Sequence, residues 1–115
     1  YATRSEALRD LIRDALIEQK LDSHSETHAL GSLTIVYDHH ASSLLQEMAT
    51  VQHLHHDLII SVMHLHVNHD DCLEVIALCG KANKINELAN SLVSLKGVKH
   101  GKLFLTLPSS NIIAQ

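Results

Sequence analysis

Apolar residues recur every three to four positions in three segments of the chain, the spacing of helices that bury one face. The first segment ends at about residue 20, and the others cover residues 44–51 and 85–93. Thr3 and Glu6 precede the first stripe in the pattern of a capping box, in which the threonine hydroxyl accepts from the third helical amide. Because its stripe must pack against another surface, we expect this helix to belong to a small separate unit.

Four further segments are rich in β-branched or alternating apolar residues and predict strands at residues 33–37, 58–67, 72–79 and 103–107. Residues 21–29 are polar and lack a periodic apolar face, so they read as a linker. From residue 31 onward the order is strand, helix, strand, strand, helix, strand. This βαββαβ order predicts an α+β, ferredoxin-like domain, with an antiparallel sheet and both helices on one face.

The predicted strand at residues 58–67 is apolar on both of its faces. Helices cover only one face of a ferredoxin-like sheet. We therefore expect the other face, with His64 and His66 on it, to be buried against another chain. This expectation predicts an oligomer with two histidines at its interface.

A histidine and cysteine motif occupies the same region. His64 and His66 lie two apart on a strand and so point to one side. If residues 68–70 form the tip of a hairpin, Cys72 lies opposite His66 and Glu74 lies opposite His64. Two imidazoles and a thiolate would supply three corners of a transition-metal site, with a carboxylate nearby. The alternative is that the histidines are ordinary core residues and the cysteine is a small buried hydrophobe.

Composition narrows the class of protein. The 115 residues include eleven histidines and carry a formal net charge of −4, so there is no overall basic signature of nucleic-acid binding. No apolar run reaches membrane-spanning length, and we expect no membrane partner. Cys72 and Cys79 fall on opposite faces of one predicted strand, beyond disulfide reach, which fits a reducing cytoplasm better than secretion. The chain begins at Tyr1 without a methionine, and we expect it to be part of a longer protein.

Two stretches carry a family resemblance. Residues 4–10 (Arg-Ser-Glu-Ala-Leu-Arg-Asp) resemble the second helix of a ribbon-helix-helix DNA-binding domain. The rest, including residues 52–53, 64–74 and 97–101, resembles the nickel-responsive regulator family NikR. The resemblance implies a partial ribbon-helix-helix domain at residues 1–22, a linker at 23–30, an ACT-like nickel-binding and tetramerisation domain at 31–108 and a tail at 109–115.

The resemblance also implies the metal ligands. In this family Ni(II) is held in a square plane by three histidines and a cysteine, which match His64, His66 and Cys72 of one subunit and His53 of a neighbour. Such a plane suits Ni(II) or Cu(II) and disfavours tetrahedral Zn(II). The matches to residues around the ligands are Tyr37, Gln52 and Glu74. The matches to carboxylates between the DNA-binding and metal-binding domains are Glu6 and Asp10.

The implied protein is a cytoplasmic homotetramer that binds operator DNA through full-length ribbon-helix-helix dimers. The base-reading ribbon and the first helix of that domain are absent from this chain, so we expect no specific DNA binding by the chain alone. Arg4, Ser5 and Arg9, at the start of the first helix, are the candidate phosphate contacts. Candidates for weaker secondary metal sites are His28, His39, His40, His55 and His56.

The function implied is a repressor of nickel-uptake genes that acts when Ni(II) is bound at a tetramer interface. Two alternatives stay open on the residues themselves. One is an ACT-type regulatory module that holds a small organic ligand at its interface, with incidental histidines. The other is a zinc hydrolase, which needs an open coordination position and a general base such as Glu74.

Overall fold

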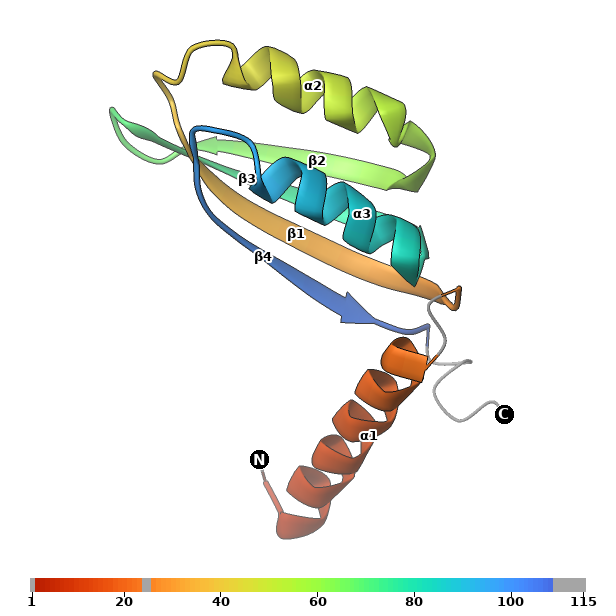
Figure 1. Ribbon diagram of the computed structural model, residues 1–115. Coiled ribbons are helices and arrows are strands. Elements are labelled where there is room, and N and C mark those ends of the chain that lie inside the picture. Colours follow the sequence, from red (N-terminus) through yellow and green to blue (C-terminus); the bar gives the residue numbers. More distant parts are fainter. Residues whose placement is uncertain (1, 24–25, 109–115) are drawn as a thin grey trace.

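The centre of the domain is a four-stranded sheet with the strand order β2-β3-β1-β4 (Figure 1). The computed structural model describes residues 2–23 and 26–108. Every neighbouring pair of strands is antiparallel. The strands are β1 (His28–Asp38), β2 (Ile59–His66), β3 (Asp71–Lys81) and β4 (Val98–Thr106).

Two helices, α2 (Leu44–Leu54) and α3 (Ala82–Val93), lie on the same face of this sheet (Figure 1). A short 3-10 turn, η1 (His56–Leu58), leads from α2 into β2. The chain thus follows the predicted βαββαβ order, and the expectation of an α+β, ferredoxin-like domain is confirmed.

The core lies between the helices and the sheet. Alternate residues of β1 and β3 point toward the helices, because successive strand residues face opposite sides. Helix α3 packs an apolar stripe at helical spacing against these residues. Each fully buried aliphatic side chain contributes about 1.5–3 kcal/mol of transfer free energy. The largest of these core residues are Leu33, Ile35, Ile76, Leu78, Ile85, Leu88 and Leu92.

Two glycines allow the backbone to close around this core. Gly97 turns the chain from α3 into β4 with a φ of 103°, a left-handed conformation that side chains disfavour. Gly101 lies on β4 opposite Ile35, where a Cβ would come within 2.5 Å of Val93 Cγ2. A side chain at Gly101 would strain the packing of α3 against the sheet, whereas one at Gly97 would strain the turn itself and press against Leu44 of α2.

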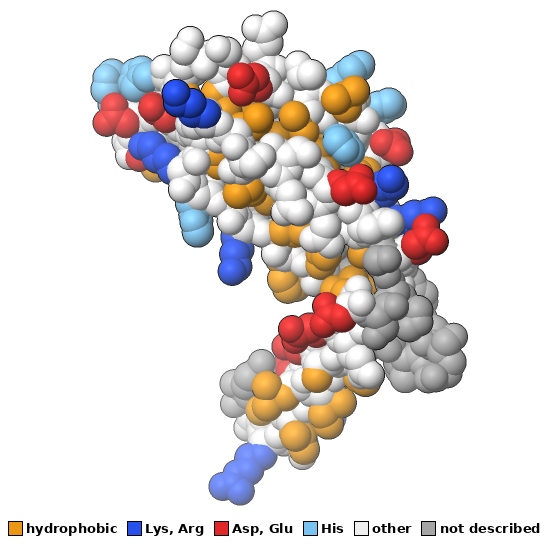
Figure 2. Space-filling model, viewed as in Figure 1, with side chains coloured by type: hydrophobic (Ala, Val, Ile, Leu, Met, Phe, Trp, Pro, Cys, Tyr) orange, Lys and Arg blue, Asp and Glu red, His pale blue; other side chains and the backbone are white. Residues whose placement is uncertain are grey.

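Helix α1 (Arg4–Ser23) extends away from the sheet and meets it near β4 (Figure 1). The predicted cap is present, since the Glu6 amide donates to Thr3 Oγ1 at 3.0 Å. Ile17 is buried near the end of the helix, whereas the rest of the apolar stripe is open to solvent, as the orange side chains in Figure 2 show. The exposed members are Leu8, Leu11, Ile12 and Leu16.

Several element boundaries differ from the sequence-based expectation. Helix α1 continues to Ser23, three residues beyond the expected end. Strand β1 begins at His28 rather than residue 33, inside the expected linker at 23–30, because β3 extends far enough for Lys81 to pair with His28. Strand β4 begins at Val98 rather than residue 103, because an edge strand tolerates the polar side chains that the apolar pattern excluded. The predicted tail at 109–115 lies outside the described residues.

Candidate metal centre

The hairpin formed by β2 and β3 has the register that the motif predicted. His64 pairs with Glu74, and His66 pairs with Cys72. The turn between the strands is held by Asn68, whose side-chain oxygen accepts from the amides of Asp70 and Asp71 at 2.9 Å each. Paired residues of an antiparallel ladder share one face, so all four side chains of the motif lie on the same side of the sheet.

The face itself is the opposite of the one expected. Cys72 and Glu74 are buried, and Gln52 of α2 donates to Glu74 Oε2 at 2.7 Å, so the motif faces the helices rather than the helix-free side. The expectation was wrong because β2 is an edge strand whose side chains are mostly exposed on both faces. An irregularity between Ile59 and Ser61 also interrupts the alternation on which it relied.

Three donor atoms converge at the end of the hairpin. The ligand atoms of His39, His66 and Cys72 all lie within 4.8 Å of one another. His39 Nδ1 is 3.3 Å from Cys72 Sγ, and the rings of His39 and His66 are 4.5 Å apart. Cys72 is 1% exposed while the two histidines reach solvent. The cluster therefore consists of a buried sulfur atom with two solvent-exposed imidazoles beside it.

The sequence assigned His39 only to weaker secondary sites. The signal that could have found it is its place directly after β1, in which Tyr37 pairs with Cys72. The His39 amide donates to the Asp70 carbonyl oxygen at 2.8 Å, which holds this loop against the β2–β3 turn.

Beside the cluster lies a buried polar network. Tyr37 is 1% exposed, and its hydroxyl is 3.0 Å from His64 Nε2. Burial, together with the charges of Glu74 and Cys72, raises the pKa of Tyr37 to about 12. The phenol thus stays protonated at neutral pH and is available as a donor to an unprotonated His64 nitrogen. Tyr37, Gln52 and Glu74, the three residues expected around the ligands, all contact one another or a candidate ligand.

The fourth candidate ligand lies apart from these donors. His53 is exposed near the end of α2, and its ring stacks on that of His56 with centroids 6.0 Å apart. Among the described residues, the group of donors around Cys72 includes neither His53 nor His64. One chain therefore brings Cys72 and His66 together and keeps His64 on the same face against Tyr37. It holds His53 apart from these side chains, stacked on His56.

The candidate DNA contacts lie at the far end of the molecule. Arg4, Ser5 and Arg9 are exposed on the first turns of α1, opposite the β2–β3 turn in Figure 1. Of the two candidate interdomain carboxylates, Glu6 also caps this helix by accepting from the Ala2 amide at 3.3 Å. Asp10 forms an ion pair with Arg13 at 3.5 Å.

The other candidate secondary histidines are dispersed. His28 Nε2 lies 3.1 Å from Cys79 Sγ, at the opposite end of β1 from His39. His55 and His56 contact backbone carbonyl oxygens of the α2 end, at 3.0 and 3.1 Å. Both cysteines are free, as their positions on opposite faces of β3 predicted.

The raised pKa of Tyr37 predicts a loss of stability in alkali. The Tyr37 phenol has its ordinary pKa of 10.0 in the unfolded chain and a pKa of about 12 in the folded chain, so between these values only the folded chain keeps the proton. The stabilisation is thus complete below pH 10 and disappears as the pH approaches 12. Between these values the free energy of unfolding should fall by on the order of 2 kcal/mol more in the wild type than in Tyr37→Phe. Urea unfolding at a series of pH values measures this, and an equal fall in both proteins would contradict it.

Comparison with solved structures supports the fold. An uncharacterized protein from Thermotoga maritima aligns with a TM-score of 0.62 at 18% identity, over 69% of this chain and 98% of that one. The ACT domain of a GTP pyrophosphokinase from Chlorobium tepidum aligns with a TM-score of 0.55 at 13% identity, over 68% of this chain and 100% of that domain. The ferredoxin-like domain is thus also ACT-like. In addition, no helix in the described part of the chain combines the length and apolar character needed to cross a bilayer.

Comparison with known sequences identifies the family. A relative from Nitratidesulfovibrio vulgaris (strain DP4), named "Putative nickel-responsive regulator", is 47% identical over 112 residues, which make up 97% of this chain and 80% of the relative. Relatives with the same name from Methanococcus aeolicus and Geobacter sulfurreducens are 46% and 47% identical, over 97% and 92% of this chain and 79% and 76% of their own lengths.

Residues 30–106 match the family model described as the NikR C-terminal nickel-binding domain. The family consists of regulators rather than enzymes, which removes the zinc-hydrolase alternative, and Ni(II) is the metal of its domain. The chain therefore belongs to the NikR family of nickel-responsive regulators.

Proposed function

We propose that this chain is the sensing part of a transcriptional repressor of nickel-uptake genes. Its Ni(II) ligands would be His64, His66 and Cys72 of one subunit and His53 of another. The observation that carries this proposal is that imidazole nitrogens of His66 and His39 lie close to the buried Cys72 sulfur, while His64 lies on the same face against Tyr37. Thiolate and imidazole are the donors that late transition metals prefer.

The residues of the network have separate tasks in this scheme. Cys72 gives up its proton to become a thiolate donor, and the His39 Nδ1–H group can then donate to the sulfur across 3.3 Å. Tyr37 orients His64 through its hydroxyl group. Glu74 lines the site, and its hydrogen bond with Gln52 holds it against α2. Bound Ni(II) supplies one rigid centre that holds donors from different segments together.

In this scheme a second subunit completes the ligand set through its His53, which is exposed near the end of α2 and lies outside the donor group around Cys72. The helix-free face of the sheet, which is separate from the helix side on which the metal-binding motif lies, offers a further contact surface between subunits. Apolar side chains gather there, and a water-exposed apolar face of this kind is typical of an interface. Its most exposed members are Met63, Leu65 and Phe104. We infer a homotetramer, in which metal occupancy is coupled to subunit arrangement.

In this proposal α1 is the element that contacts DNA. Its exposed apolar stripe fits a helix that packs against the other helices of a ribbon-helix-helix dimer. In such a dimer Arg4, Ser5 and Arg9 would approach DNA phosphates. Glu6 and Asp10 lie on the same helix. The family resemblance implies that these carboxylates face a metal-binding domain where it meets the dimer. Fixing the spacing of two such dimers would favour operators with two half-sites, because both would be engaged together.

The ligand assignment predicts a split among the histidines. His64→Ala and His66→Ala each remove a donor and should weaken Ni(II) binding by about tenfold to 100-fold. His55→Ala should leave affinity unchanged, because His55 Nδ1 contacts the Val51 carbonyl oxygen and His55 belongs to no donor group of the described residues. Equilibrium dialysis measures the three affinities. Equal losses in all three would indicate a diffuse histidine cluster, and failure of the wild type to bind any metal would favour a small-ligand ACT module.

A further inference from the structure

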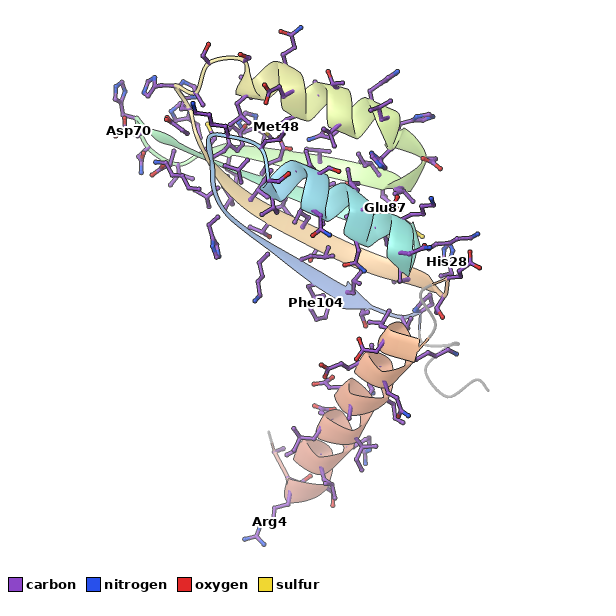
Figure 3. The ribbon with its side chains drawn as sticks, in the orientation of Figure 1. Arg4, His28, Met48, Asp70, Glu87 and Phe104 are labelled. Atoms are coloured by element: carbon purple, nitrogen blue, oxygen red, sulfur yellow. The ribbon has the colours of Figure 1, made fainter. Side chains whose placement is uncertain are left out.

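A groove lies between the second half of α1 and the end of β4. It has a volume of about 310 Å³, at the lower end of the range for ligand pockets. Figure 3 labels Phe104 on β4, on the side of the sheet from which α1 extends. The lining is mainly apolar with two carboxylates, and it includes Asp14, Ile17, Glu18, Leu21, Phe104 and Leu105. We propose that this groove binds a linear alkyl diamine that is protonated at both ends.

The groove is separate from the candidate metal centre. Cys72 and Val98 both pair with Tyr37 at one end of the sheet, whereas Thr106 pairs with Leu30 at the other end. Among the described residues, no group of metal donors includes a side chain of the groove. A diamine in this groove would therefore bind independently of the metal.

The apolar part of the groove is incompletely covered by the chain itself. Ile17 is 9% exposed where α1 meets the sheet, and Leu21 packs against the same core. Phe104 is 63% exposed, although it lies beside these aliphatic side chains. Methylene groups laid across the Phe104 ring would remove this apolar surface from water, which favours binding.

The two carboxylates define the charge of the ligand. Asp14 and Glu18 are four residues apart on α1, so they share one face at a spacing of about 6 Å along the helix axis. Both are exposed, and neither forms an ion pair with another described residue, whereas Asp10 pairs with Arg13. Like charges at this spacing repel each other, and a ligand with two positive charges would relieve that repulsion.

An alkyl diamine combines these two features. When it is extended, a chain of four methylene groups separates two ammonium nitrogens by about the rise of one helical turn. Each ammonium would then meet one carboxylate while the methylene groups cover the apolar lining. Mg(II) would leave that lining exposed, and a single ammonium would leave one carboxylate without a partner. Because the diamine contacts both α1 and β4, it would favour one orientation of the helix relative to the sheet.

Phe104 is the single phenylalanine of the chain, so its ring is a reporter placed in the groove. The test is an NMR titration of the whole chain, labelled at phenylalanine, with 1,4-diaminobutane at constant ionic strength. The Phe104 ring signals should shift and reach saturation. 1-Aminobutane, which has one charge, should bind about twofold to fivefold more weakly, the range for one exposed ion pair. 1,4-Butanediol, which has no charge, should bind more weakly still.

Two variants test the carboxylates. Asp14→Asn and Glu18→Gln keep the shape of each side chain and remove its charge. Each should weaken binding of 1,4-diaminobutane by about twofold to fivefold and should reduce its advantage over 1-aminobutane. Glu47→Gln is the matched control, since Glu47 is an exposed carboxylate on α2 outside the groove and its replacement changes the net charge equally.

The outcomes decide between a groove and a general attraction of cations. A wild type without a saturable shift at Phe104 would overturn the site, as would equal affinities for 1,4-diaminobutane and 1-aminobutane. Equal weakening in Glu47→Gln would indicate that the dication responds to net charge alone, and would also overturn the site. The comparison of the three ligands uses the wild type, so it decides the matter even where a variant fails to fold.

Discussion

Replacing Cys72 by serine is expected to abolish the sulfur-to-nickel charge-transfer band and to weaken Ni(II) binding by more than about 100-fold, because the only sulfur donor of the cluster is lost. Serine is close in size to cysteine, so the buried position beside Tyr37 stays filled. A hydroxyl does not lose its proton readily enough to replace a thiolate. Ultraviolet and visible absorption during a Ni(II) titration measures the band, and dialysis measures the affinity.

Cys79→Ser is the matched control. Cys79 lies on the same strand but on the opposite face, where its sulfur is 3.1 Å from His28 Nε2. This variant should keep both the band and the affinity of the wild type. If Cys72→Ser keeps the band, or if Cys79→Ser loses it, the assigned sulfur ligand is wrong.

The order of elements and the hairpin register were predictable because they depend on local chemistry. Apolar spacing sets each helix, and the polar turn around Asn68 sets how β2 pairs with β3. The pairing of His66 with Cys72 and of His64 with Glu74 followed from that turn alone.

The face of the motif and the part played by His39 were not predictable in the same way. Strands β2 and β3 are apolar on both sides, so alternation does not reveal which side meets the helices. That choice is made by long-range contacts such as Gln52 with Glu74. His39 follows a strand in a polar loop, and only the pairing of β1 with β3 brings it to Cys72.

Subunits that carry His53→Ala should bind Ni(II) weakly on their own, although their three other ligands are intact. His53 is exposed, stacks on His56 and lies outside the donor cluster of its chain, so in this account it completes a site in a different subunit. Subunits that carry Cys72→Ser should fail as well, for lack of the sulfur. Each variant retains the group that the other has lost.

The most direct test of the account is to assemble these two variants together and to titrate the mixture with Ni(II). A site is complete when Cys72 comes from a His53→Ala subunit and His53 comes from a Cys72→Ser subunit. With equal amounts and random assembly of equivalent subunits, about a quarter of the sites are complete. The account therefore predicts that about a quarter of the wild-type charge-transfer absorption returns on mixing. No recovery, in assemblies that native mass spectrometry shows to be mixed, would contradict a metal site shared between subunits.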